Sequence, residues 1–164
     1  MVGRNHKRRS PGLGAQVGVF VLLLVLVTAA ASSGALSVDN TQGEYMGLTQ
    51  PSWAPPGWLF GPVWSVLYLM IAASAWLVWK RAGFGAAMAL WCGQMVLNAA
   101  WTPIFFGFGQ TGWALVDIVL LWFAIVGTIA VFWRISRPAA GLLLPYLAWV
   151  SFATALNAAI WSLN

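Results

Sequence analysis

The chain has 164 residues, of which 61% are hydrophobic and only 7% are charged. Soluble domains carry roughly 25% charged residues, and a water-soluble fold of this length could not hide so much apolar side chain, so the composition excludes a soluble protein. The net charge of +5 does not indicate nucleic-acid binding, because the basic residues stand at the ends of the apolar runs, where the orientation signals of membrane proteins lie.

Five apolar segments follow a basic tail that covers residues 1–16. Each segment is long enough to cross a bilayer as a helix, which takes about 20 residues. Their continuous apolar character differs from the ~10-residue alternating strands of a membrane β-barrel. We therefore predict an all-α integral membrane protein in which residues 17–164 form a single bundle of five transmembrane helices. The predicted helices cover, approximately, residues 17–36, 62–79, 86–106, 113–133 and 139–161.

The first apolar segment has a second interpretation. The stretch MVGRNHKRR, the apolar core after it and the small residues AAASSGA also resemble a secretory signal peptide. Cleavage there would leave four helices instead of five.

Positively charged residues are distributed unevenly around the predicted helices. They occur before helix 1, after helix 2 and between helices 4 and 5, which five spans place on one side of the membrane. The opposite side holds the helix 1–2 connection, the helix 3–4 turn and the C-terminus, without any Lys or Arg. Because positive residues accumulate on the inner side, we predict that the N-terminus lies inside and the C-terminus outside.

The connection between helices 1 and 2, at residues 37–59, is the one long link in the predicted bundle. Long connections in compact proteins are usually functional or disordered. This connection contains Tyr45, Trp53 and Trp58, and a segment so rich in aromatic rings is not typical of disorder. We therefore expect an ordered loop that covers the outer end of the bundle.

Polar and aromatic residues recur at helical spacing in helices 2, 3 and 5. In chain order they are Trp64 and Tyr68, then Gln94, Asn98, Trp101 and Phe105, then Tyr146, Trp149, Ala153 and Asn157. Spacings of three, four and seven residues place side chains on one face of a helix. Asn98 and Asn157 lie about 6–12 Å from the outer ends of their helices. We therefore expect the three faces to meet in the outer half of the bundle, beneath the loop that carries Trp53.

Such a meeting point has the chemistry of a ligand pocket. Trp and Tyr walls offer a flat, polarisable surface to a planar ring system, and two amides supply orienting hydrogen bonds. Ala153 leaves room beside the rings, which suits a large, flat, mostly apolar ligand such as a tetrapyrrole. The alternative interpretation is structural, because Asn and Gln often hold membrane helices together and Trp often marks the water interface.

The sequence contains no motif for other chemistry. Its single histidine, His6, and single cysteine, Cys92, are far apart, and it has no carboxylate cluster that would bind a metal. We therefore expect no obligatory cofactor. Any enzymatic activity would depend on a light-absorbing or redox-active ligand, with Trp64 and Trp149 as its partners.

Asp117 is the one acidic residue inside a predicted span, one turn into helix 4. A carboxyl group at this depth is a ligand contact or a proton site, or it reaches outward to water. We favour the outward orientation.

Helix 3 also carries a pair of small residues, Ala89 and Gly93, which let helix backbones approach closely. Their face differs from the face of Gln94 and Asn98. We expect it to hold a homodimer together, and a contact within the bundle is the alternative.

Three blocks of the sequence form one extended motif, which covers most of the chain from about Ser33 to Asn164. They read Tyr45-x-x-Leu48-x-x-Pro51-Ser52-Trp53-x-Pro55-Pro56-Gly57 with Gly61-Pro62-x-Trp64-x-x-Leu67-Tyr68, then Gln94-x-x-x-Asn98-x-x-Trp101-x-Pro103-x-Phe105-Phe106-Gly107, and finally Leu144-Pro145-Tyr146-x-x-Trp149-x-x-Phe152-Ala153-x-x-x-Asn157. The motif resembles that of the translocator protein family, also called tryptophan-rich sensory proteins or peripheral-type benzodiazepine receptors.

The resemblance implies a five-helix membrane protein, commonly dimeric, that binds porphyrins and synthetic benzodiazepine-type ligands. Bacterial members are linked to tetrapyrrole handling and to stress or light responses, and some have been proposed to degrade protoporphyrin oxidatively. This chain departs from the family pattern at Glu44 and Gln50, where an aromatic residue and a Lys are frequent. The family's pocket residues match Tyr45, Trp53, Trp64, Asn98, Trp101, Trp149 and Ala153.

Three functions compete on these grounds. The first is a receptor or sensor-transport protein for porphyrin-type or haem-type tetrapyrroles. The second is an enzyme that degrades bound protoporphyrin with light or oxygen. The third is a generic small-molecule transporter, which we rank last because transporters carry polar residues through the whole membrane depth, whereas the inner halves of these helices are nearly all apolar.

Overall fold

The computed structural model describes residues 12–164, except for the side chains of residues 30–46. All regular elements of the described chain are helices, as predicted, and they are joined by short irregular links. In order they are α1 (Leu13–Gly47), the 3₁₀ turn η1 (Gly57–Leu59), α2 (Phe60–Ala82), α3 (Ala86–Thr102), the π-helical turn η2 (Pro103–Gly107), α4 (Thr111–Ile135), α5 (Arg137–Leu142) and α6 (Leu144–Leu163).

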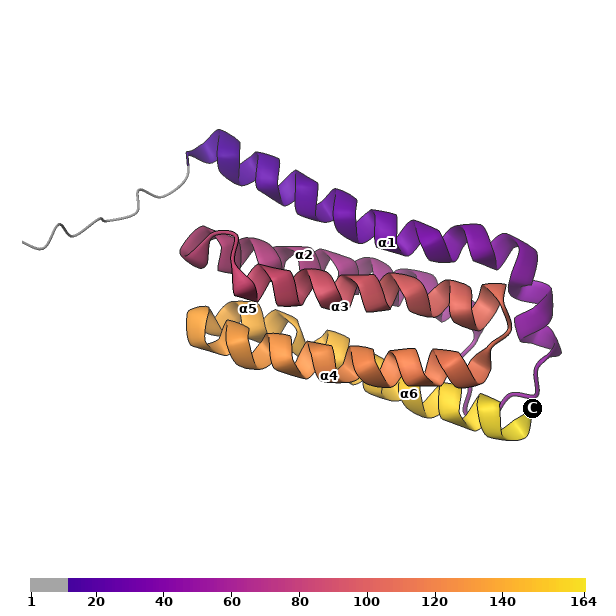
Figure 1. The fold of residues 1–164 in the computed structure, drawn as a ribbon. Helices are drawn as coiled ribbons and strands as arrows, with labels where there is room; N and C mark the ends of the chain where they lie inside the picture. The colour runs from indigo at the N-terminus through magenta and orange to yellow at the C-terminus, as the bar shows by residue number, and fades with distance from the viewer. Residues whose placement is uncertain (1–11) are drawn as a thin grey trace, which may run out of the picture.

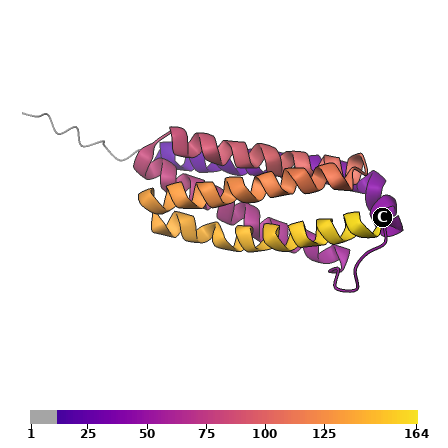
Figure 2. The same cartoon turned by 60° about the horizontal axis from the view of Figure 1, so that its bottom comes forward.

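The helices form a bundle of roughly parallel and antiparallel rods (Figures 1 and 2). The first helix, α1, packs along the side made by α2 and α3, and α4 and α6 lie on the opposite side. Two of the links turn at glycines, Gly83 with φ 71° and Gly109 with φ 62°. Both angles lie in the left-handed region, which glycine adopts at no steric cost, so these tight reversals are built into the sequence.

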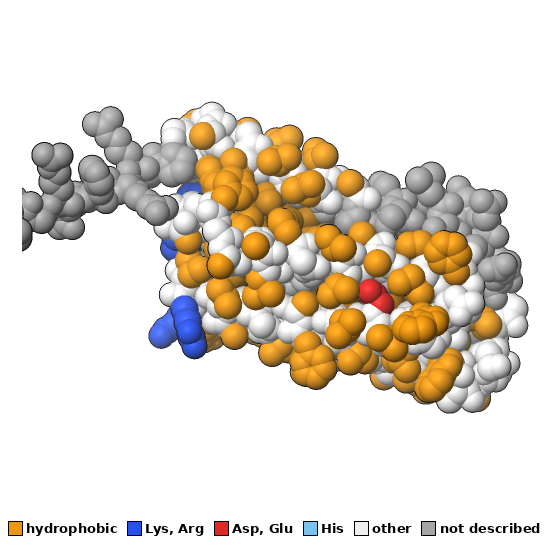
Figure 3. Space-filling model, viewed as in Figure 1, with side chains coloured by type: hydrophobic (Ala, Val, Ile, Leu, Met, Phe, Trp, Pro, Cys, Tyr) orange, Lys and Arg blue, Asp and Glu red, His pale blue; other side chains and the backbone are white. Residues whose placement is uncertain are grey.

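The surface of the bundle is that of an integral membrane protein. By length and composition, three helical stretches of the described chain can cross a membrane, namely Gly57–Ala82, Thr111–Ile135 and Arg137–Leu163. Hydrophobic side chains cover much of the face in Figure 3, and Lys and Arg gather at one end. Such extensive exposed apolar surface is expected where lipid replaces water, and the predicted class, an all-α membrane bundle, is confirmed.

The first helix is longer than its apolar stretch. We predicted a helix over residues 17–36 and a loop over 37–59, but α1 continues to Gly47 and its direction changes near that end (Figure 1). Hydrophobicity marks where a helix leaves the membrane, whereas backbone hydrogen bonding continues into water until a glycine or proline interrupts it. Gly47 and the later Pro51 supply that interruption, so the irregular link is shorter than predicted.

Prolines divide two of the other predicted helices. Pro103 lacks a backbone N–H, and the chain continues there as η2, where the Phe108 N–H donates to the Pro103 carbonyl at 2.9 Å. Pro145 likewise follows a turn at Leu143, so the fifth predicted helix is observed as α5 and α6. The apolar pattern cannot reveal such breaks because it continues across them.

The half of the bundle that ends at Lys80 and Arg137 is called the inner half here, after the predicted orientation, and it is closely packed around small residues. Ala72 and Ala75 of α2 and Ala139 of α5 are fully buried, which lets the two backbones approach. Ser74 Oγ donates to the Ala139 carbonyl at 2.8 Å, and Arg81 donates to Ser136. Further along, α2 diverges from α6, and few of their residues come close. The space between these two helices contains the candidate site.

Candidate ligand site between α2, α3 and α6

Asn98 of α3 joins the helices on both sides of it. The Tyr68 hydroxyl of α2 donates to Asn98 Oδ1 at 3.2 Å, and Asn98 Nδ2 donates to the Tyr146 hydroxyl of α6 at 3.0 Å. Asn98 is 5% exposed and Tyr146 is fully buried. The three predicted faces therefore meet at one amide group, and the structural role of Asn that we weighed from the sequence is observed.

Side chains alone bridge the gap between α3 and α6. No Cα atom of α3 lies within 8 Å of one in α6 along the described chain. The aromatic rings near Asn98 belong to α2 and α6. Trp64 stacks on Tyr68 with ring centroids 5.0 Å apart and meets Tyr146 edge-on at 6.1 Å. Aromatic pairs in these geometries attract each other beyond their buried area. These ring contacts therefore stabilise the packing of α2 against α6.

A second polar contact lies nearer the outer ends of α3 and α6. Trp101 Nε1 donates to Asn157 Oδ1 at 3.1 Å, and Asn157 Nδ2 donates to the Thr111 carbonyl at the start of α4 at 2.8 Å. Phe105, on the π-helical turn η2, stacks on Trp101 at 5.1 Å. The wider π turn carries Phe105 into the bundle, where it is 3% exposed.

The link after α1 covers this end of the bundle. Trp53 meets Phe152 of α6 edge-on at 5.8 Å, although 48% of its surface stays exposed. Asn164 binds both polar atoms of the Thr49 backbone, because Thr49 N donates to Asn164 Oδ1 at 2.9 Å and Asn164 Nδ2 donates to the Thr49 carbonyl at 3.1 Å. The link is thus tied to the end of α6.

Three polar side chains in or beside the site have no hydrogen-bond partner. Gln94 is fully buried, and neither its amide nitrogen nor its amide oxygen is bonded. The indole N–H groups of Trp91 and Trp149 are also buried without a partner. An unmade buried hydrogen bond costs roughly 1–3 kcal/mol, and such groups in a native structure call for an explanation. They are free to bond polar atoms of a bound molecule.

The predicted site residues occupy three connected groups. Tyr68, Asn98, Trp64 and Tyr146 form the first, with Gln94 one turn along α3 from Asn98, and Trp101, Phe105 and Asn157 form the second. Trp53 and Trp149 form the third group, because each contacts the ring of Phe152. Ala153 is 7% exposed and belongs to the main core cluster. Tyr45 is among the residues whose side chains lie outside the described part.

Sequence reasoning missed three residues of this region. Phe60 and Phe152 flank Trp149, with ring centroids 5.7 Å and 5.5 Å from it. Trp91 shares the face of Gln94 and Asn98, since spacings of three and seven residues fall on one side of a helix. That spacing was a usable signal for Trp91, and it also held for Phe60, four residues before Trp64, and for Phe152, three residues after Trp149.

The structure corrects the expected orientation of Asp117. Its side chain does not reach outward to water, because only 9% of the residue is exposed and Oδ2 is buried without a partner.

Ala89 and Gly93 lie on an exposed face of α3, and a Cβ atom added at Gly93 would meet nothing within 4 Å. These two small residues therefore make no close contact inside the described bundle. No group of three His, Cys, Asp or Glu side chains in the described part could hold a metal ion.

Comparison with known proteins gives consistent matches over most of the chain. A sequence model of the TspO/MBR family matches residues 8–162. The human translocator protein is 47% identical over 125 residues, which cover 73% of this chain and 74% of the relative. The tryptophan-rich protein TspO of Chlorobaculum tepidum is 46% identical, covering 73% of this chain and 78% of that protein. The tryptophan-rich sensory protein of Cereibacter sphaeroides is 34% identical, covering 89% and 91%.

The bridge through Asn98 predicts an energetic coupling between α3 and α6. We expect Asn98→Ala and Tyr146→Phe to destabilise the protein less together than the sum of their separate effects, because both remove the same hydrogen bond. Interhelical hydrogen bonds in membranes average about 0.6 kcal/mol and reach about 1.7 kcal/mol. Unfolding in mixed detergent micelles measures this coupling. Asn157→Ala with Tyr146→Phe is the matched control and should be additive, and equal coupling in the two pairs would contradict the bridge.

Proposed function

The chain belongs to the TspO/MBR family of integral membrane proteins, and on that premise we propose that it binds porphyrin-type tetrapyrroles between α2, α3 and α6. Synthetic benzodiazepine-type ligands would use the same site. The protein would thereby act as a receptor or sensor-transport protein.

The observation that carries this proposal is the set of buried polar groups without partners beside the aromatic rings. A porphyrin presents a flat apolar face and a few polar edge groups. Trp64 and Tyr146 offer ring surfaces to that face, and the free amide of Gln94 and indole N–H of Trp149 offer hydrogen bonds to its edge. Binding would separate rings that now contact one another and satisfy the groups that are now unpaired.

Access would come from the outer end of the bundle. The link that carries Trp53 contacts α6 through the Trp53–Phe152 ring pair, the Asn164–Thr49 bonds and the packing of Leu48 and Ala54 on the cluster that contains Leu156 and Ile160. Both Asn164–Thr49 bonds are exposed to solvent, so displacing the link costs less than separating two buried helices. The link would move aside for a ligand and then cover it.

Porphyrin titration of the purified protein in darkness tests the site. We expect a saturable change in the Soret band of protoporphyrin, with affinity at least tenfold weaker in Trp64→Ala or Asn98→Ala, a loss of about 1.4 kcal/mol. Trp133→Ala is the matched control, since Trp133 is half exposed at the other end of α4, and it should bind normally. Unchanged affinity in both site variants would remove the assignment, and working in darkness keeps binding separate from any photochemistry.

We also propose that the end bearing Lys80 and Arg137 faces the inner side of the membrane. The described basic residues lie at one end of the bundle, which agrees with the tendency of positive residues to remain inside. In a Cys92→Ser background, a membrane-impermeant maleimide should label Gln110→Cys in intact cells and Arg137→Cys only after lysis. The reverse pattern would contradict this orientation.

The exposed face of Ala89 and Gly93 supports a homodimer, which we propose as the protein's assembly. Small residues on a lipid-facing surface let two helices approach closely, and the exposed Cys92 lies between them in sequence. A short bismaleimide should therefore cross-link two copies through Cys92 in membranes, and Gly93→Leu should reduce the yield severalfold. With Cys92→Ser, a cysteine at exposed Val131 on α4 serves as the control. Equal cross-linking at both positions would contradict the dimer.

A further inference from the structure

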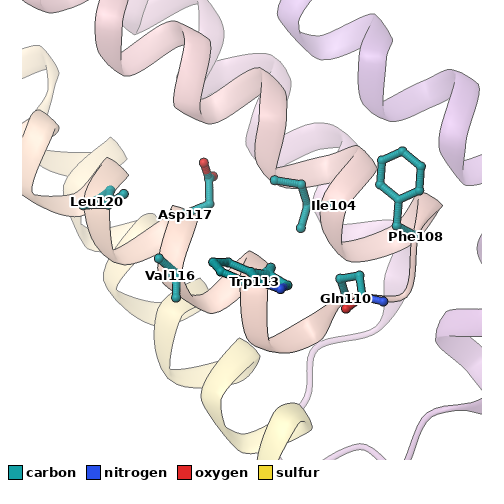
Figure 4. Close-up of a pocket in the computed structure, with 7 residues that line it drawn as sticks. All are labelled: Ile104, Phe108, Gln110, Trp113, Val116, Asp117 and Leu120. Carbon is teal, nitrogen blue, oxygen red and sulfur yellow. The ribbon is translucent and has the colours of Figure 1, made fainter.

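A hollow of about 420 Å³ lies on the flank of the bundle, where η2 and α4 meet. Its volume falls in the ~300–1,000 Å³ range of small-molecule sites. The described lining consists of hydrophobic side chains from both elements, a polar Gln110 at the outer end and the carboxyl group of Asp117. In Figure 4 the Asp117 side chain extends from α4 into the space beside Ile104. The hollow lies outside the porphyrin site proposed above.

Asp117 is unusual because one oxygen of its carboxyl group is buried inside a membrane span without a partner. The residue is 9% exposed, and Oδ2 makes no hydrogen bond. It lies about 9 Å along α4 from Thr111, at 1.5 Å per residue. Acidic side chains at such positions are costly, and they commonly face a partner or a functional cavity.

None of the described basic side chains can neutralise Asp117. Lys80 and Arg81 end α2, and Arg134 lies in the last turn of α4, about 26 Å along the helix from Asp117. The fourth, Arg137, begins α5 at that same end. An ionised carboxyl group at Asp117 therefore has no cationic partner among the described side chains.

The surroundings of the carboxyl group favour a cationic ligand with an apolar body. Trp113 is 69% exposed and Phe108 is 73% exposed at the rim of the hollow, and aromatic faces attract ammonium groups. Val116 and Leu120 extend the lining on α4, half exposed to the lipid side. A ligand must reach this hollow through lipid, so it must be lipophilic, and an ionised carboxylate accepts but cannot donate a hydrogen bond.

We propose that this hollow binds a lipophilic amine. Its ammonium group pairs with Asp117, and its apolar body lies against Trp113, Val116 and Leu120. The amine leaves the bilayer laterally, and its charge satisfies the one buried carboxyl group in the described part of the chain. No covalent step is involved.

Native mass spectrometry of the full chain released from detergent micelles tests the proposal with three probes of equal chain length. The probes are N,N-dimethyldodecylamine, dodecanol and dodecanoic acid. We expect one amine per protomer, at a half-saturating concentration at least tenfold below that of the alcohol, and no saturable binding of the acid. Asp117→Asn should bring amine binding to the level of the alcohol, whereas Asp117→Glu should keep most of the preference.

A second variant keeps the test decisive if Asp117→Asn does not fold. Leu120→Trp leaves the carboxyl group in place and fills the hollow, so it should also weaken amine binding at least tenfold. Equal binding of amine and alcohol by the unaltered protein would overturn the proposal. Retained amine preference in folded Asp117→Asn, or unweakened amine binding in Leu120→Trp, would do the same.

Discussion

The Asn98 side chain holds the outer half of this bundle in its observed form. It accepts from Tyr68 and donates to Tyr146, and in doing so it links α3 both to α2 and to α6. Between α3 and α6 no Cα atoms of the described chain come within 8 Å of each other, and side-chain hydrogen bonds connect the two helices instead. A space that is bounded by side chains can change its shape when a few aromatic rings rotate, without movement of a helix.

The bundle therefore divides into two parts with different physical character. In the inner half, buried alanines of α2 and α5 bring two backbones together, and close packing of this kind resists any change in volume. In the outer half, rings, amides and unpaired polar groups occupy the space between diverging helices. Packing stabilises the first part, and the second part is suited to recognition. The hollow that Asp117 lines opens on another face of the bundle, which separates the two proposed ligand sites.

Much of this arrangement could be predicted from residue spacing. The faces of Tyr68, Asn98 and Tyr146 were identified because helical periodicity fixes which side chains share a side, and depth along each helix fixes where they meet. Features that depend on backbone breaks or on packing from distant residues were not predictable. The predicted end of the first helix was wrong because hydrophobicity indicates where the chain leaves the membrane and not where the helix ends. The predicted outward orientation of Asp117 was wrong because its environment is set by η2, whose π turn leaves no mark in the apolar pattern.

The central claim is that a porphyrin binds beside Asn98, in the space between α2, α3 and α6. Solution NMR of the protein labelled with ¹⁵N-asparagine tests it directly, through the side-chain amide signals of Asn98 and Asn164 during titration with protoporphyrin in darkness. Ligand binding must change the ring currents and hydrogen bonds around Asn98, so its Nδ2 signals should shift and saturate with the bound fraction. Asn164 bonds Thr49 at the far end of α6, and its signals should shift less. Saturated porphyrin binding with unmoved Asn98 signals would contradict the account.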